Sequence, residues 1–180
     1  MGPITTTTAL EPAPPKSYWV IPGRLLAGAY PASADFSDSR AQLAQLQEIG
    51  VNYFVDLTEE DELPRYRHLL PFRVKYLRCA IPDHGVPPDI APIKRLLLEM
   101  HAALASGRCI YLHCRAGIGR TNLIVGCYLA EQGDDGKAAL KHVNVLWRRS
   151  GRAAIWPQVP ETAAQADYVR RWPDLAKQTP

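Results

Sequence analysis

The 180-residue chain has a composition typical of a globular domain, with 47% hydrophobic and 22% charged residues. Its formal net charge is +3, and its basic residues are spread along the chain without forming one block. This distribution argues against a nucleic-acid-binding protein. The longest apolar run, residues 123–130, is far too short to span a bilayer. We therefore expect neither a nucleic acid nor a membrane as a partner.

The cysteines and the N-terminal segment indicate where the protein works and where its domain begins. Cys79, Cys109, Cys114 and Cys127 follow neither zinc-ligand spacing nor the density of a disulfide-stabilised scaffold, so we expect reduced thiols in a cytoplasmic protein. Residues 1–16 are rich in Thr and Pro and are expected to form a flexible tail. A single domain, favoured as a monomer, is expected over residues 17–180.

The predicted elements alternate between strands and helices. Two apolar runs separated by Pro22 and Gly23 predict a hairpin within residues 18–31. Further strands are predicted from β-branched, aromatic or continuous apolar content, at 51–58, 73–82 and 109–113. Helices are predicted from apolar spacing and end signals, at 33–50, 90–106, 121–132, 135–149 and 161–172. This order indicates an α/β fold with a central, mainly parallel sheet of four to five strands flanked by helices.

The loop HCRAGIGRTN, residues 113–122, directly follows a predicted buried strand, at the end of the sheet where α/β folds bind ligands. Gly117 and Gly119 let successive backbone N–H groups point into one concavity at a helix N-terminus, which suits a phosphate group. Cys114 would lie near that helix end and near Arg120, and both surroundings lower the pKa of a thiol. Cys114 is therefore predicted to be a nucleophile.

The neighbouring residues have the chemistry that phosphoryl transfer to sulfur needs. Arg120 can bind two phosphoryl oxygens with its planar fork. We expect the Thr121 hydroxyl to donate to the sulfur and help it leave. We expect His113 to hold the shape of the loop by hydrogen bonds to the loop's backbone. The departing oxygen needs a general acid from another element, for which Asp83 in IPDHGVPPD is the candidate. The expected phosphate loop comprises Arg115, Ala116, Gly117, Ile118, Gly119 and Arg120, with Arg115 adding positive potential at the pocket mouth.

This pattern resembles the HCxxGxGR(S/T) signature of the cysteine-based protein tyrosine phosphatases, and PDHG at 82–85 is similar to their acid loop, usually WPD. The segment PETAAQADYVRRW is similar to the one that supplies a water-positioning glutamine in many small members, here Gln165. The resemblance covers residues 18–172 and the length is similar to compact dual-specificity members, particularly bacterial ones. It implies hydrolysis of phosphotyrosine, and also of phosphoserine and phosphothreonine, in proteins through a cysteinyl-phosphate.

No metal or other cofactor is expected, because the loop and Arg120 supply the positive charge that a metal would otherwise provide. An inositol phosphate or phosphoinositide is the nearest alternative substrate. A non-catalytic phosphoprotein-binding module, a sulfurtransferase and an arsenate reductase are more distant alternatives. Two positions depart from the family pattern: Ile81 replaces the usual Trp of the acid loop, and Asn122 stands where Gly or Ser is frequent.

The remaining charged residues have simpler interpretations. Residues 59–62 are interpreted as a solvated acidic turn, and His84 as a solvent-facing loop histidine. The arginines at the end of the fourth predicted helix and just after it are interpreted as solvent-facing: Arg148, Arg149 and Arg152. Gln165 is alternatively an exposed helix residue. Three cysteines are interpreted as inert core thiols: Cys79, Cys109 and Cys127.

Overall fold

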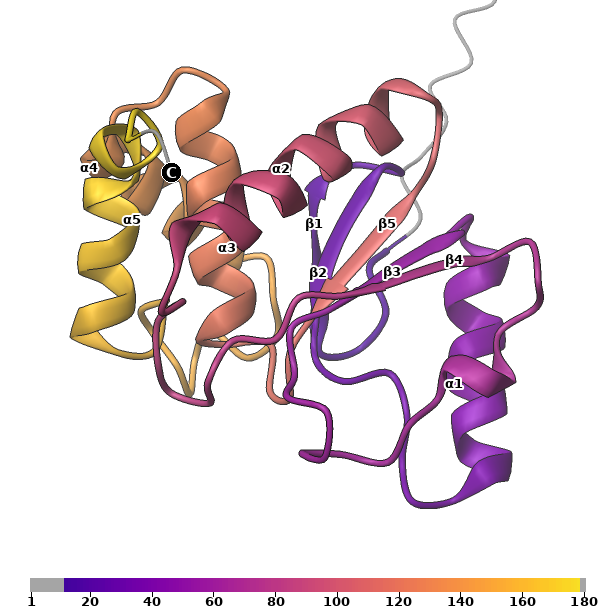
Figure 1. The fold of residues 1–180 in the computed structure, drawn as a ribbon. Helices are drawn as coiled ribbons and strands as arrows, with labels where there is room; N and C mark the ends of the chain where they lie inside the picture. The colour runs from indigo at the N-terminus through magenta and orange to yellow at the C-terminus, as the bar shows by residue number, and fades with distance from the viewer. Residues whose placement is uncertain (1–11, 179–180) are drawn as a thin grey trace, which may run out of the picture.

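A computed structural model describes residues 12–178 and contains one five-stranded sheet in the order β1-β2-β5-β3-β4 (Figure 1). The strands are β1 (Ser17–Ile21), β2 (Leu25–Gly28), β3 (Tyr53–Asp56), β4 (Lys75–Arg78) and β5 (Ile110–His113). β1 pairs with β2 in an antiparallel hairpin, whereas β2, β5, β3 and β4 are parallel neighbours. The predicted hairpin and mainly parallel sheet are confirmed.

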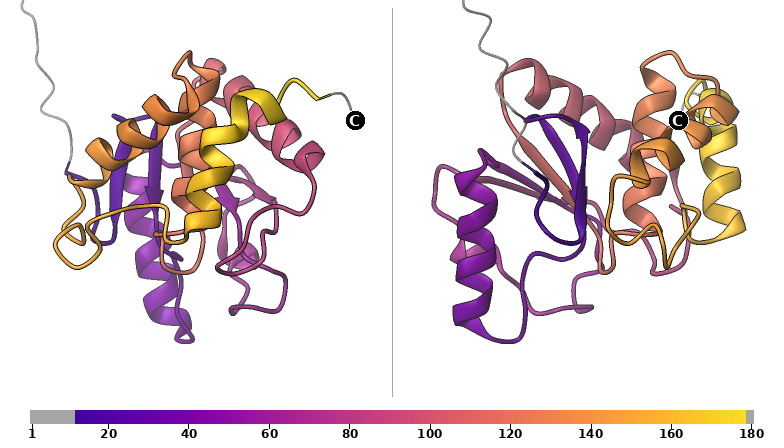
Figure 2. Two further views of the ribbon diagram at one scale, coloured as in Figure 1. Left: turned by 90° about the vertical axis from the view of Figure 1, so that its left-hand side faces the viewer. Right: turned by 180° about the vertical axis from the view of Figure 1, so that it is seen from behind.

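Helices cover both faces of the sheet (Figure 2). They are α1 (Phe36–Glu48), the short 3-10 helix η1 (Arg67–Leu69), α2 (Ile90–Ala105), α3 (Arg120–Glu131), α4 (Gly136–Trp147) and α5 (Ala163–Leu175). α1 packs on one face through Leu43 and Leu46, and α2 to α5 contribute to a larger core on the other. The α/β class and the five predicted α-helices are thus confirmed.

The helix N-termini differ in how their backbone N–H groups are satisfied. Asp35, Asp89 and Asp135 accept hydrogen bonds from the first turns of α1, α2 and α4, and α5 begins with a capping box. α3 begins after Gly119 and has no side-chain cap. Its first N–H groups are consequently available to a ligand at the carboxyl end of β5.

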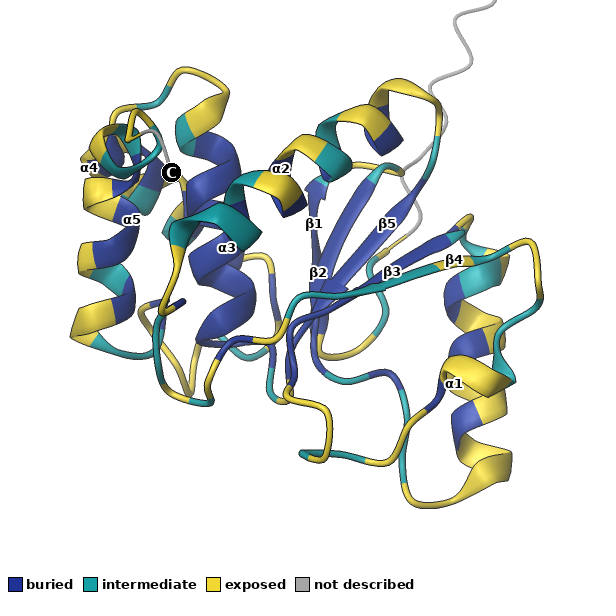
Figure 3. Ribbon diagram, viewed as in Figure 1, coloured by how far each residue is buried: buried dark blue, intermediate teal, exposed yellow. Residues whose placement is uncertain are grey.

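α3 lies at the centre of the helical layer, as Figure 3 shows by its almost continuous burial. Every residue from 120 to 129 is buried. Gly126 allows α5 to approach closely, because a Cβ there would lie 2.6 Å from the Val169 Cγ1 atom. This packing holds the beginning of α3, and therefore the loop before it, in a fixed position.

Residues 1–11, most of the predicted tail, lie outside the described residues. The next segment contacts the sheet: the Pro14 carbonyl accepts from Ser17 N–H at 3.1 Å, and the Lys16 carbonyl accepts from Ala29 N–H at 3.1 Å. Among residues 12–178, no helix combines the length and apolar character needed to cross a membrane.

Candidate active site

Cys114 follows β5 directly and lies nearly buried at the start of the loop that leads into α3. Its Sγ atom accepts a hydrogen bond from the Gly117 N–H at 3.3 Å, so the loop curls around the sulfur. A cavity of about 50 Å³ opens above it. The lining residues are Asp83, His84, Cys114, Arg115, Ala116, Gly119, Arg120 and Glu161. Thus the structure brings together the thiol, guanidinium and carboxyl groups singled out in the sequence.

The loop packs tightly against the hairpin. Gly117 has φ +73°, and a Cβ there would lie 2.5 Å from the Gly28 carbonyl carbon. Asn122 Nδ2 donates to the carbonyls of Gly117 at 3.0 Å and Ile118 at 2.8 Å, while its Oδ1 accepts from the Tyr18 hydroxyl. Asn122, a departure from the family pattern, therefore holds the loop by two hydrogen bonds and is itself anchored to β1 by a third.

Gly117→Ala should destabilise the protein by about 2 kcal/mol or more, because it combines a positive φ with a backbone clash. Gly107→Ala is the matched control: Gly107 has φ +88°, but nothing lies within 4 Å of the position that a methyl group there would occupy. That variant should lower the free energy of unfolding by only about 1 kcal/mol. Urea unfolding of both variants measures the difference, and equal losses would show that the Gly117 contact with Gly28 is unimportant.

His113 is fully buried beneath the loop. Its Nδ1 lies 3.3 Å from the Cys114 carbonyl oxygen and its Nε2 lies 2.6 Å from the Tyr66 hydroxyl. Burial is the largest influence and lowers the pKa of His113, although Asp56 opposes it. A neutral ring that donates from Nδ1 to the carbonyl and accepts at Nε2 from Tyr66 satisfies both contacts.

Asp56, at the end of β3, anchors the surroundings of His113 and was not predicted. Its Oδ1 accepts from the Thr58 N–H at 2.9 Å and hydroxyl at 2.6 Å, and its Oδ2 accepts from Tyr76 at 2.7 Å and Arg78 at 3.1 Å. Burial raises the pKa of Asp56, but the hydrogen bonds from Thr58 and Tyr76 lower it, so the pKa lies below its usual value. A fully buried carboxylate is thereby satisfied by four donors.

Glu62 pairs with Arg120, and its predicted place in a solvated turn is wrong. The side chains of Arg120 and Glu62 are only 1% and 6% exposed. Arg120 Nη1 and Nη2 each donate to one Glu62 oxygen at 2.7 Å, and Nη1 also donates to the Ile81 carbonyl at 3.1 Å. Arg115, 52% exposed, donates from Nε to Glu62 at 3.0 Å. The Glu62 side chain is buried because two arginines of the phosphate loop surround it. Glu59, Glu60 and Asp61 are exposed, as predicted for this turn.

Burial opposes ionisation of Glu62, but hydrogen bonds from Arg120, the Glu59 backbone and Arg115 prevail and lower its pKa from 4.5 to about 2. The carboxylate therefore stabilises the fold fully above about pH 4.5, and this contribution disappears as pH falls towards 2. Glu62→Gln should lower the free energy of unfolding by about 2 kcal/mol at pH 7 and by much less near pH 2.5.

Denaturant unfolding across pH measures this difference. Glu60→Gln is the control, because Glu60 is 68% exposed in its pair with Arg65 and should contribute less than about 1 kcal/mol. A Glu62→Gln penalty that persists unchanged at acidic pH would contradict the assignment.

Asp83 lies over the cavity and contacts the same guanidinium. Its Oδ1 accepts from Arg120 Nη2 at 2.7 Å, while its Oδ2 lies 3.9 Å from Arg115 Nε and 3.8 Å from His84 Nε2. His84 is exposed, as predicted, but its Nδ1 also lies 3.2 Å from Glu161 Oε2. The acid loop is consequently held over the cavity by ionic contacts.

Gln165 is fully buried, so its alternative interpretation as an exposed helix residue is wrong. Its Nε2 donates to the Gly85 carbonyl in the acid loop at 3.0 Å, and its Oε1 accepts from Thr162 N–H at 3.2 Å. A Cβ at Gly119 would lie 2.8 Å from Gln165 Oε1. Gln165 therefore bridges the acid loop and the phosphate loop.

Thr121 and Arg152 contact different backbone carbonyls around the phosphate loop. The Thr121 hydroxyl, predicted to donate to Cys114, donates instead to the Gly28 carbonyl at 3.4 Å. Arg152 donates to the Ala116 carbonyl and is half-buried, so its interpretation as solvent-facing is wrong. The turn after α4 therefore lies against the phosphate loop.

The other cysteines are buried or half-buried free thiols. Burial raises the pKa of Cys109 to about 11 and that of Cys79 and Cys127 above the usual value. These thiols are protonated at neutral pH, which agrees with their interpretation as inert.

Related proteins place this chain in a known family. Residues 14–167 match the family described as "Swiss Army Knife protein, DSP-PTPase phosphatase domain". "Putative tyrosine phosphatase 067L" of Invertebrate iridescent virus 3 is 39% identical over 108 residues, 57% of this chain and 41% of that protein. "Phosphatidylglycerophosphate phosphatase PTPMT1" of Arabidopsis thaliana is 30% identical over 145 residues, 76% of this chain and 40% of that protein. The chain thus spans about two fifths of these relatives.

Solved structures share the fold. Tk-PTP in its active form superimposes with a TM-score of 0.72 and 22% identity, covering 89% of this chain and 97% of that one. The structure of PTPMT1 in complex with PI(5)P superimposes with a TM-score of 0.63 and 20% identity, covering 88% of this chain and 96% of that one. With the match over residues 14–167, the chain belongs to the dual-specificity branch of the cysteine-based protein tyrosine phosphatases.

Proposed function

We propose that this protein hydrolyses phosphotyrosine, and also phosphoserine and phosphothreonine, in proteins through a phosphorylated Cys114. The observation that carries the proposal is one cavity lined by the Cys114 thiol, the Arg120 guanidinium and the Asp83 carboxyl, at the uncapped start of α3. These groups supply the nucleophile, the binding of phosphoryl charge and the acid that a metal-independent transfer needs.

In the first step, the Cys114 thiolate attacks phosphorus, and the bond to the leaving oxygen breaks. Backbone N–H groups of residues 115–120 and the Arg120 fork bind the phosphoryl oxygens. Asp83 accepts from Arg120 Nη2 at 2.7 Å, and we expect a phosphoryl oxygen to take over that N–H. Asp83 is then released towards the leaving oxygen, to which it gives its proton.

In the second step, Asp83 takes a proton from water while the water oxygen attacks phosphorus and the S–P bond breaks. Gln165 would position that water, which its contact with the Gly85 carbonyl supports, since Gly85 is two residues from Asp83. Thr121 would donate to the departing sulfur after turning from the Gly28 carbonyl.

The charges at the cavity mouth favour a single phosphate monoester over an inositol polyphosphate. Asp83 and Glu161 line the cavity, and its cation Arg115 already donates to Glu62. A second phosphate would therefore meet carboxylates and a cation that is already paired. A phosphoinositide remains the second candidate, because the structural neighbour PTPMT1 holds PI(5)P.

The substrate assignment is tested by comparing a phosphotyrosyl peptide, its phosphoseryl and phosphothreonyl counterparts and inositol phosphates in the presence of chelator. We expect kcat/KM to be highest for the phosphotyrosyl peptide. A higher value for the inositol phosphates would replace the proposal with the second candidate.

Asp83→Asn should lower kcat for the phosphotyrosyl peptide about 100-fold at neutral pH, because asparagine has no proton to give to the leaving oxygen. The loss should be smaller for aryl esters whose leaving groups are more acidic. Asp89→Asn, at the cap of α2, is the control and should retain full kcat. Equal losses for all leaving groups would remove Asp83 from the role of acid.

A further inference from the structure

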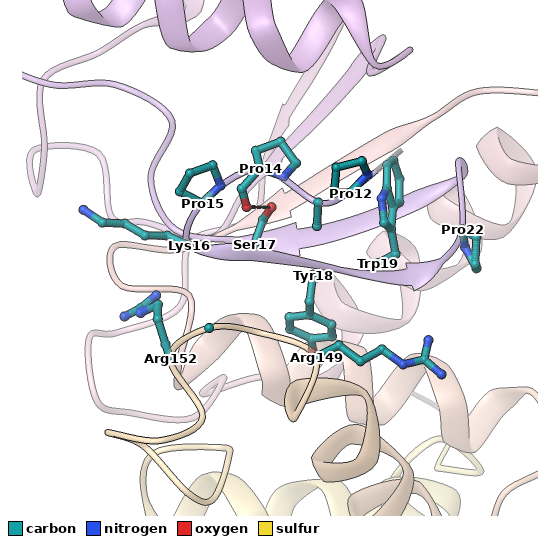
Figure 4. A pocket seen from close by; sticks show the side chains of 12 residues that line it. Pro12, Pro14, Pro15, Lys16, Ser17, Tyr18, Trp19, Pro22, Arg149 and Arg152 are labelled. Atoms are coloured by element: carbon teal, nitrogen blue, oxygen red, sulfur yellow. Dashed lines mark hydrogen bonds between the residues drawn. The ribbon is translucent and has the colours of Figure 1, made fainter. Parts of the chain in front are cut away.

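A second hollow, of about 640 Å³, lies between the segment that enters β1 and the turn after α4 (Figure 4). One wall comes from residues 12–19 and Pro22, and the other from Arg149, Gly151 and Arg152. We call it the basic groove. In Figure 4 the two arginines lie across from the prolines of the first wall.

The charge of the basic groove is one-sided. Among the residues that the structure describes, Lys16, Arg149 and Arg152 line it and no acidic residue does. Within residues 12–178, none of these three cations forms an ion pair with a carboxylate. The catalytic cavity differs, because Asp83 and Glu161 face its cations. The groove is therefore complementary to a negatively charged ligand.

The apolar part of the groove is preformed. Pro12, Pro14, Pro15 and Pro22 line it, and their rings restrict the backbone. Lys16 has φ +63°, and its carbonyl is fixed by the Ala29 N–H. A rigid apolar wall beside exposed cations suits an extended peptide with acidic and apolar side chains. The backbone of that wall needs little ordering when the peptide binds.

The groove adjoins the catalytic cavity. Arg152 lines the groove and donates to the Ala116 carbonyl, while Ala116 lines the catalytic cavity. One phosphate-loop residue therefore connects the two hollows. A peptide whose phosphoryl group lies over Cys114 can reach the groove within a few residues, since an extended chain spans about 3.3 Å per residue.

We propose that the basic groove binds an acidic segment of the substrate protein close to its phosphorylated residue. This inference rests on the proposed action on phosphoproteins. It assigns to Lys16 and Arg149 a role in substrate selection that does not involve the phosphoryl group.

The first test compares two phosphotyrosyl peptides that differ only in flanking Glu or Ser residues. We expect the KM of the acidic peptide to be about fivefold lower, and Lys16→Glu/Arg149→Glu to abolish that preference. kcat and KM for para-nitrophenyl phosphate should stay within about twofold of wild type. The charge-matched control is Lys141→Glu/Arg170→Glu, at a different hollow between α4 and α5, and it should keep the preference. Equal effects of both double variants would overturn the proposal.

The second test is independent of turnover. Amide resonances of residues 14–19 and 149–152 should shift on titration with the unphosphorylated acidic peptide, and not with the Ser peptide. Shifts without peptide hydrolysis would refute the action on phosphoproteins and leave the groove's acidic preference standing. Hydrolysis with no shifts in these residues would overturn the groove alone. The proposal would also be overturned if phosphatidylglycerol vesicles bound through Lys16 and Arg149 while the acidic peptide caused no resonance shifts. The groove would then bind a membrane surface.

Discussion

Cys114→Ser is expected to lower kcat for a phosphotyrosyl peptide by at least about 10⁴-fold. A serine hydroxyl is a far weaker nucleophile than a thiolate at neutral pH, and the described site has no base in contact with Cys114 Sγ to activate it. The smaller oxygen fits the space of the sulfur, so the thermal unfolding midpoint should remain close to that of wild type. Steady-state turnover and calorimetry measure the two effects.

Cys79→Ser provides the matched control, because Cys79 is a half-buried free thiol outside the cavity. It should retain wild-type kcat within about twofold. Turnover that survives in Cys114→Ser, or is lost in Cys79→Ser, would show that the nucleophile lies elsewhere.

Arg120→Lys is expected to lower kcat/KM by about 10³-fold. The Arg120 fork holds both Glu62 oxygens, the Ile81 carbonyl and Asp83 at once. One ammonium nitrogen cannot reproduce that planar arrangement and still bind two phosphoryl oxygens. Lysine keeps the positive charge beside buried Glu62, so the loss reports on geometry more than on an unpaired carboxylate.

Arg115→Lys is the control for Arg120, because Arg115 also donates to Glu62 but is half-exposed. Its loss in kcat/KM should stay below about tenfold. Kinetics with the phosphotyrosyl peptide measure both variants. Similar losses for Arg115→Lys and Arg120→Lys would contradict the special position of Arg120 at the start of α3.

The fold was predictable because its elements have strong local signals. Apolar periodicity and Gly107 defined α2 to within a residue, and the nearly continuous apolar character of residues 121–132 indicated the central helix. α5 was predicted to end at Trp172 but continues through Pro173 to Leu175. A proline loses its own N–H bond, and near a helix end the surrounding packing compensates for that loss.

The site was predictable where one short segment carries it. Cys114, Arg120 and the glycines lie in a single loop, so their spacing alone brings them together. Glu62 comes from the segment after β3, and its charge and acidic neighbours predicted an exposed side chain. The available signal was topological: β3 is a neighbour of β5, so residues after β3 reach the same edge of the sheet.

The positions of Arg152 and Gln165 at the site were likewise not predictable from local sequence. Both lie far along the chain from the loops that they contact, and polar side chains on helix ends or turns are usually exposed. Their burial follows from packing of α4 and α5 against α3, which no local pattern encodes.

Phosphorylation of Cys114 is tested most directly by a rapid acid quench during turnover of a phosphotyrosyl peptide, followed by mass spectrometry of the digested protein. Transfer through Cys114 should leave one phosphoryl group on the fragment that contains Cys114, bound to its sulfur. A phosphoryl group on another side chain, or turnover without any phosphorylated protein at the earliest quench times, would contradict it.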